Sequence, residues 1–214
     1  MDVIVLLGAP GAGKGTAATR LVARLSARHV SSGDLLRDAV RRDTPAGREA
    51  DGFMKRGDLV PDALVGRIIA DLLAAGDAGQ RYLLDGFPRT EAQAEMLDRV
   101  VGEQGGHLRG VVLLDVAEEV LVDRLAGRRV CPQCAANFHV RTLPPRKPGV
   151  CDACGATLVT RADDNQDTVR TRLAVFHERT ASLIAWYERR GQLRRVDGTG
   201  GADEVAERIM RALA

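Results

Sequence analysis

The segment from Gly8 to Thr16 has the residue types and spacing of a phosphate-binding loop. Its sequence, GAPGAGKGT, follows G-x-x-x-x-G-K-[ST] with one departure, because Gly15 separates Lys14 from Thr16. Glycines let successive backbone N–H groups converge on phosphate oxygens, and the Lys14 ammonium can reach the β- and γ-phosphates. The alternative, a glycine-rich turn that binds nothing, is weaker because a strand pattern precedes the loop and a helix pattern follows it. The segment therefore predicts binding of a nucleotide.

The four cysteines of the chain are a second group that can do chemistry. Cys131, Cys134, Cys151 and Cys154 form the pattern C-x2-C-x16-C-x2-C. Two thiolates on each tight turn can point at one ion, and four of them complete a tetrahedral zinc shell. Such a shell leaves no position for water, so the site would be structural. A redox or disulfide pair is the less favoured interpretation, and iron in the same thiolate shell stays open.

Composition limits the partners of the protein. The chain has 31 basic and 29 acidic residues among 214, a net charge of +2, which argues against a protein that mainly binds a nucleic-acid backbone. No stretch reaches 18 uninterrupted apolar residues, and the N-terminus lacks a secretory pattern, so we expect no membrane partner. Clustered cysteines suit a metal in a reducing compartment. These features predict a cytoplasmic protein.

Short apolar runs alternate with helical stretches along most of the chain. The strand candidates cover residues 3–7, 82–84, 111–114 and 193–196. Helical periodicity covers about 16–28, 33–42, 47–56, 61–75, 91–101, 117–126, 165–190 and 202–213. Thr90 to Gln93 has the form of a capping box, and Pro61 suits a first helical position. The alternation predicts an α/β fold with a doubly wound parallel sheet.

Two stretches depart from this alternation. Residues 31–60 hold helical patterns without a central strand, which indicates a small helical insert. Residues 127–164 contain all four cysteines, several prolines and little helical periodicity, which indicates a β-rich flap. The expected core therefore comprises 1–30, 61–126 and 165–214.

Five motifs occur in a fixed order along nearly the whole chain. They are the phosphate loop, SSGDLLR at 31–37, LDGFPRT at 84–90, DR-x-x-GRR at 123–129 and TR-x-DD at 160–164. Together they closely resemble the adenylate kinase family, and the insert at 127–164 is similar to the long lid of its zinc-bearing members. The resemblance implies a P-loop fold with a helical AMP-binding insert and a zinc-bearing lid. It also implies a monomer that reversibly converts ATP and AMP to two ADP with Mg²⁺, which maintains adenine nucleotide balance.

The resemblance further implies roles for single residues. On the ATP side these are Gly11, Ala12, Gly13, Lys14, Gly15, Thr16, Arg124, Arg128, Asn137, Phe138 and Gly200. On the AMP side they are Ser32, Arg37, Asp58, Leu59, Val60, Gly86, Phe87, Pro88, Arg89, Gln93, Arg161 and Arg172. The expected catalytic residues, which would stabilise charge on the transferring group, are Lys14, Arg89, Arg128, Arg161 and Arg172.

Some of these assignments have a chemical reason of their own. Arg89 and Asp85 follow a predicted strand end, where doubly wound sheets bind ligands, and Asp85 is expected to hold Mg²⁺ through water. The Gln93 amide can both donate and accept, as an adenine reader must. The family more often has Thr at the position of Ser32 and a basic residue at that of Asp58. Asp163 and Asp164 are expected at the lid hinge or as a helix cap.

Two other functions compete with adenylate kinase activity as interpretations of the sequence. A kinase for UMP, CMP or GMP would share the phosphate loop, although short-lid pyrimidine kinases lack the long insert. A zinc-ribbon binding module with a regulatory P-loop would need aromatic platforms for bases. The chain has only seven aromatic residues, and Phe138 is the one in the cysteine hairpin, which argues against the module.

Overall fold

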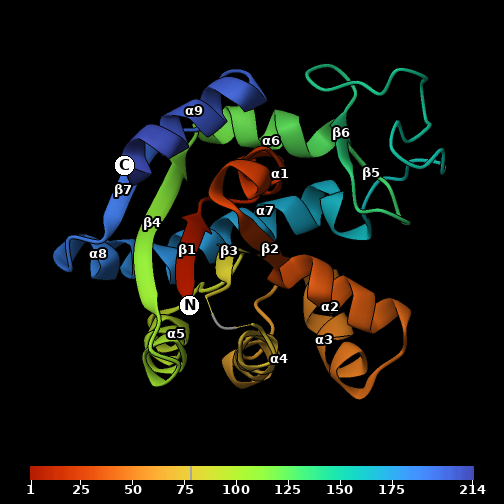
Figure 1. Cartoon of the computed structure of the whole chain (residues 1–214). Coiled ribbons are helices and arrows are strands. Elements are labelled where there is room, and N and C mark those ends of the chain that lie inside the picture. The colour runs from red at the N-terminus through yellow and green to blue at the C-terminus, as the bar shows by residue number, and fades with distance from the viewer. Residues whose placement is uncertain (78) are drawn as a thin grey trace.

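A parallel sheet forms the centre of the protein (Figure 1). The computed structural model describes residues 1–77 and 79–214. The strands of this sheet lie in the order β2-β3-β1-β4-β7, and every neighbouring pair is parallel. Their bounds are β1 Asp2–Leu7, β2 Ala27–Ser31, β3 Arg81–Asp85, β4 His107–Asp115 and β7 Leu193–Asp197. The parallel α/β sheet expected from the sequence is confirmed.

Helices cover both faces of the sheet because alternate strand residues are apolar on each side. Val3, Val5 and Leu7 pack in one buried cluster with residues of α4 (Asp62–Ala74), α5 (Glu91–Glu103) and α8 (Ala181–Arg189). Ile4 and Leu6 pack on the other face in a second cluster. Its helices are α1 (Lys14–Leu25), α6 (Glu118–Ala126), α7 (Gln166–Val175) and α9 (Ala202–Leu213). A π-helical turn, Phe176–Thr180, joins α7 to α8 within the stretch expected as one helix.

Strand β2 corrects the expectation for the region before residue 31. The helix expected over 16–28 begins at Lys14 and ends at Leu25, and Ser26 adopts the left-handed conformation (φ 48°) that turns the chain into the strand. Only Ala27 and Val30 of β2 are fully buried, because the strand lies at the edge of the sheet. Its Arg28 and His29 break the apolar run by which strands were recognised.

Two helices follow β2 and pack tightly against each other. They are α2 (Ser32–Arg41) and α3 (Pro45–Arg56). The side chains of Ser31 and Thr44 cap their N-termini by accepting the backbone N–H groups of Asp34 and Gly47. A Cβ at Gly47 would lie 2.2 Å from the Ala39 carbonyl oxygen, so this close contact requires glycine.

The cysteine segment, which the sequence indicates as a β-rich flap, forms a small antiparallel structure with short strands. Strands β5 (Arg128–Val130) and β6 (Asn137–His139) pair with each other, and Val130 also bridges to Val159. Cys131, Cys151 and Leu158 form its buried apolar cluster. A 3₁₀ turn, Ala162–Asp164, leads from the flap into α7.

Three expected helix starts differ in detail. Thr90 caps α5, but only half of the capping box forms, because the Gln93 side chain accepts from Arg89 N instead of Thr90 N. Helix α4 begins at Asp62, one residue after Pro61. Asn165, not Asp163 or Asp164, caps α7 by accepting from Thr168 N at 2.9 Å. The two aspartates form ion pairs with arginines instead.

Candidate active site

The loop after β1 needs glycine for both conformation and space. Gly8, Gly11 and Gly13 have φ values of 146°, 87° and 96°, which L-residues rarely adopt. A Cβ at Gly8 would lie 2.9 Å from the Leu114 carbonyl oxygen, and one at Gly11 would lie 2.9 Å from that of Leu121. The loop therefore presents backbone to the cleft and leads directly into the positive end of α1.

Lys14 lies at the first position of α1 and turns back over the loop. Its Nζ donates to the carbonyl oxygens of Gly8 at 2.7 Å and Ala9 at 3.0 Å. The pKa of Lys14 is lowered to about 8, chiefly because the side chain is removed from water. Asp85 opposes this shift, and the charges of nearby arginines add to it. The Lys14 ammonium therefore has too little negative charge around it, and a bound polyphosphate would supply that charge.

Asp85 ends β3 and faces the loop. Its side chain is buried, and a Cβ at Gly15 would lie 3.4 Å from its Oδ2. Burial raises the pKa of Asp85, but nearby His29 and the charge of Lys14 outweigh this effect and hold it below its usual value. His29 Nε2 lies 3.6 Å from Asp85 Oδ2. An ionised carboxylate beside a phosphate loop fits Mg²⁺ held through water.

A cavity of about 560 Å³ opens above the loop, within the usual size range of ligand pockets. Every residue expected on the ATP side lines it: Gly11, Ala12, Gly13, Lys14, Gly15, Thr16, Arg124, Arg128, Asn137, Phe138 and Gly200. Arg124 is held at the rim by hydrogen bonds to the carbonyl oxygens of Gly198 (3.0 Å) and Ala12 (3.3 Å).

A second, smaller cavity adjoins the first and contains most residues expected on the AMP side. These are Ser32, Arg37, Asp58, Leu59, Val60, Gly86, Arg89, Gln93 and Arg172. Phe87 and Pro88 are buried and do not line it, and Arg161 lines the larger cavity. Residues lining both cavities mark where the two meet: Gly33, Arg37, Gly86, Arg89 and Arg172.

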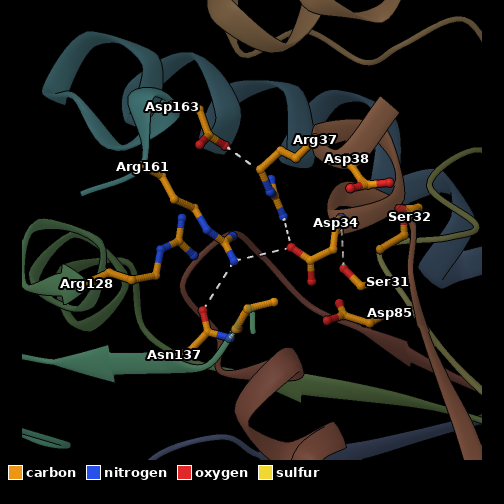
Figure 2. Close-up of polar contacts among 12 residues, drawn as sticks. Ser31, Ser32, Asp34, Arg37, Asp38, Asp85, Arg128, Asn137, Arg161 and Asp163 are labelled. Carbon is orange, nitrogen blue, oxygen red and sulfur yellow. Dashed lines mark hydrogen bonds and ion pairs between the residues drawn. The ribbon is translucent and has the colours of Figure 1, made fainter. Parts of the chain in front are cut away.

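Ion pairs between arginines and carboxylates connect three parts of the chain around this junction (Figure 2). Arg37 of α2 donates to Asp34 Oδ1 at 2.7 Å and lies 3.8 Å from Asp163 Oδ2. Arg161 donates to Asn137 Oδ1 at 3.2 Å and lies 3.5 Å from Asp34 Oδ1. The helix pair and the flap are therefore in contact across the mouth of the site.

The same cluster extends to the core through Asp163 and Asp164. Arg128 forms a bidentate pair with Asp164, and Arg172 contacts Asp163 Oδ2 at 2.9 Å and Asp164 Oδ1 at 3.2 Å. Burial raises the pKa of Asp163, but the adjacent arginines, Arg172 above all, keep it below its usual value. Burial together with neighbouring arginines lowers the pKa of Arg161 to about 10.

Arg89 lies at the point where the cavities meet. Its Nε donates to the Gly86 carbonyl oxygen at 2.8 Å, which also accepts from Ser32 Oγ at 2.6 Å. Burial lowers the pKa of Arg89 to about 10, and the charges of Arg172 and Arg37 contribute. The guanidinium groups gathered here repel one another, so the site favours a highly charged anion between them.

Sequence reasoning did not assign site roles to several residues that the fold brings to the site. His29 directly follows the helix expected over 16–28 and belonged to no expected element, whereas the structure places it in β2. Asp34 and Asp163 were part of expected motifs, but the sequence did not show their long-range partners. Asp163 lies near Arg37, and Asp34 lies near Arg161. Met54 and Val65 line the second cavity as apolar residues of helices, and nothing in the sequence distinguished them from core residues.

The four cysteine sulfurs gather at one end of the flap. All Sγ atoms lie within 4.8 Å of one another, with separations of 3.4 Å for Cys131–Cys154, 3.5 Å for Cys134–Cys151 and 3.6 Å for Cys134–Cys154. A tetrahedral ion with bonds of about 2.3 Å would place sulfurs about 3.8 Å apart, so the donors fit zinc.

The two cysteine turns have the same backbone design. Cys131 O accepts from Ala135 N, and Cys151 O accepts from Gly155 N. Ala135 and Gly155 occupy the same left-handed position, with φ values of 59° and 76°. Hydrogen bonds, above all from the backbone N–H of Cys134, lower the pKa of Cys131 to about 6, which favours its thiolate form. The pKa values of Cys134 and Cys154 are raised in the same cluster. Both turns therefore form the tight structure expected from the spacing.

The phosphate loop of a parallel α/β sheet, with two cavities that meet among arginines, is typical of a P-loop phosphotransferase. The sequence model of the family "Adenylate kinase" matches residues 6–192. Adenylate kinases of Moorella thermoacetica and Syntrophobacter fumaroxidans are 48% and 46% identical to this chain over 210 residues. That length is 98% of this chain and 97% and 99% of the relatives. The chain belongs to the adenylate kinase family.

No helix among residues 1–77 and 79–214 is long and apolar enough to cross a membrane.

Proposed function

We propose that this protein transfers the terminal phosphoryl group of ATP to AMP, reversibly, to give two ADP. The observation that carries the proposal is the junction of the two cavities at Arg37, Arg89 and Arg172. A donor nucleotide on the phosphate loop and an acceptor in the second cavity would direct their phosphates at this point. Two polyanions can approach only where fixed cations neutralise both.

The residues at the junction act by position and charge. Lys14 and the loop N–H groups would hold the β- and γ-phosphates, while Arg89 would orient the AMP phosphate in line with the γ-phosphorus. An oxygen of the AMP phosphate attacks that phosphorus and ADP leaves, so the acceptor phosphate supplies the nucleophile. Arg128, Arg161 and Arg172 would stabilise the charge on the equatorial oxygens of the transferring group. Magnesium bound near Asp85 would neutralise charge on the ATP phosphates.

Carboxylates already paired with the arginines would give way as substrates bind. Asp34, Asp163 and Asp164 are the partners of Arg37, Arg161, Arg128 and Arg172. Phosphate groups carry more charge and more acceptor oxygens than one carboxylate, and they can take over guanidinium donors. We therefore propose that residues 31–60 and 127–164 act as AMP-binding and lid inserts on a core of 1–30, 61–126 and 165–214.

Zinc and compartment complete the proposal. The four thiolates would hold one structural Zn²⁺, leaving no open position for catalysis. Free thiols at this spacing suit a reducing compartment, which supports a cytoplasmic location. The near-neutral net charge argues against nucleic acid as a partner. We propose a monomer because the family resemblance implies one.

One assay tests the proposed reaction and its runner-up. Purified protein is incubated with ATP, Mg²⁺ and AMP, CMP, UMP or GMP, and diphosphate formation is followed. We expect AMP to give the highest kcat/KM. A higher kcat/KM with UMP, CMP or GMP would favour a kinase for that monophosphate. No transfer to any acceptor, with ATP still bound, would favour a binding module.

A further inference from the structure

The amide of Gln93 is held from both sides in the wall of the second cavity. Gln93 is 2% exposed. Its Oε1 accepts from the backbone N–H of Arg89 at 2.7 Å, and its Nε2 donates to Asp62 Oδ1 at 2.7 Å. Both contacts have good hydrogen-bond lengths, so the amide plane is fixed.

The hydrogen-bonding character of these two partners determines the positions of the oxygen and the NH₂ group of the Gln93 amide. A backbone N–H can only donate, so it requires the carbonyl oxygen of Gln93. An ionised carboxylate can only accept, so Asp62 requires the NH₂ group. A flipped amide would oppose donor to donor at Arg89 and acceptor to acceptor at Asp62.

Asp62 is itself held in place by the start of the next helix. Its Oδ2 accepts from Thr90 Oγ1 at 2.8 Å, and Thr90 Oγ1 accepts from Gln93 N at 3.2 Å. Asp62 begins α4 and Thr90 caps α5, so the contact joins two helix starts. The half-formed capping box has a purpose here, because it leaves the Gln93 side chain to Asp62 and Arg89.

We propose that Asp62 is a positioning residue that selects 6-aminopurine over 6-oxopurine nucleotides in the acceptor cavity. This inference rests on the proposed function, in which AMP occupies that cavity beside Gln93. After its two fixed contacts, the amide retains one N–H and one oxygen lone pair. Adenine offers an acceptor at N1 next to a donor at the 6-amino group, which matches this pair. Hypoxanthine and guanine offer a donor at N1 next to an acceptor at O6, the reverse order.

The test compares AMP with inosine monophosphate (IMP), which differs from AMP only at positions 6 and N1 of the base. In Asp62→Asn, the side chain can turn either its oxygen or its NH₂ toward Gln93, so a flipped amide is mismatched only at Arg89. We expect the preference for AMP over IMP to fall by about three- to tenfold, the value of one hydrogen bond. The ratio is measured by equilibrium titration and by kcat/KM.

Two further variants keep the result interpretable. Asp71→Asn, an exposed carboxylate on the same helix, should leave the AMP to IMP ratio unchanged. Asp62→Ala removes the acceptor without adding a donor and should also lower the ratio, while ATP affinity stays unchanged in all three variants. Melting temperatures confirm that each variant is folded under assay conditions.

Several outcomes would overturn the inference. If Asp62→Asn and Asp62→Ala weakened AMP and IMP by the same factor, Asp62 would only stabilise the local fold. If both affinities and their ratio were unchanged, another group would orient Gln93. A wild type that phosphorylates no AMP would instead overturn the proposed function, and with it the role of Asp62. Failure of the proposed function is therefore seen in the wild type, whereas failure of the role of Asp62 alone is seen only in the Asp62 variants.

Discussion

Binding of ATP should be coupled to the protonation of Lys14. The free protein holds the pKa of Lys14 at about 8 because the side chain is removed from water among three arginines. Phosphates beside the ammonium favour its charged form and raise that pKa on binding. Above pH 8 the free protein therefore has to take up a proton to bind ATP, and affinity falls as pH rises.

The size of this effect follows from the titration. Between pH 8 and pH 9 the protonated fraction of free Lys14 falls from about one half to about one eleventh. The dissociation constant of ATP should therefore rise about fivefold over that interval, and approach tenfold per pH unit above it. The γ-phosphate is already ionised throughout this range, so the ligand adds little to the slope.

Calorimetric titration of ATP from about pH 7 to about pH 9.5, in buffers of different ionisation enthalpy, measures both the affinity and the protons taken up. Lys14→Met should abolish the slope and lower kcat about 100-fold, because a charge-stabilising donor is lost. Lys55→Met is the matched control, since Lys55 is exposed and pairs only with Asp51 in the described structure.

Two results would refute this reasoning. One is a flat affinity for wild type across the alkaline range, or an equal slope in Lys14→Met. The other is a near-normal kcat in Lys14→Met, which would show that Lys14 does not contact the reacting phosphates.

Two other substitutions test the acceptor site and the flap. Arg89→Ala should reduce AMP affinity and kcat by about 100-fold or more while ATP affinity is kept, whereas Arg67→Ala on the exposed face of α4 should change neither. Loss of ATP affinity with AMP affinity intact would show that Arg89 does not act in the acceptor cavity. Cys131→Ser should lower the melting temperature and release zinc from a wild type that carries about one ion per chain, while part of the activity survives at lower temperature. A wild type that is fully stable with no metal would contradict the zinc assignment.

The sequence predicted the elements that bury long apolar runs and missed those that do not. Val3 to Leu7 is apolar at every position because both faces of β1 are covered by helices. Strand β2 lies at the sheet edge and carries Arg28 and His29, so its pattern did not stand out from the preceding helix. Propensity and periodicity detect burial on a regular face, and an edge strand has little of it.

Site residues were predictable where neighbouring residues in the sequence determine their role, and not where the role depends on tertiary contacts. The glycines of the loop and the spacing of Cys131 and Cys134 each specify a local turn, which the structure has. The Gln93 side chain illustrates the opposite case. Its local sequence indicates a capping box, but contacts with Asp62 and Arg89 determine where the amide points. No pattern within 90–93 contains that information.

The paired base of the flap has a consequence for how such proteins diversify. Val130 N donates to Val159 O at 2.8 Å, and Val159 N donates to Val130 O at 2.9 Å, so the two ends of the flap leave the core side by side. The length and contents of the chain between them then hardly affect the span that the core must accommodate. Evolution can exchange this segment as a unit, replacing the two cysteine turns by another cross-link or a small apolar cluster. An engineer can do the same, with Val130 and Val159 as the splice points.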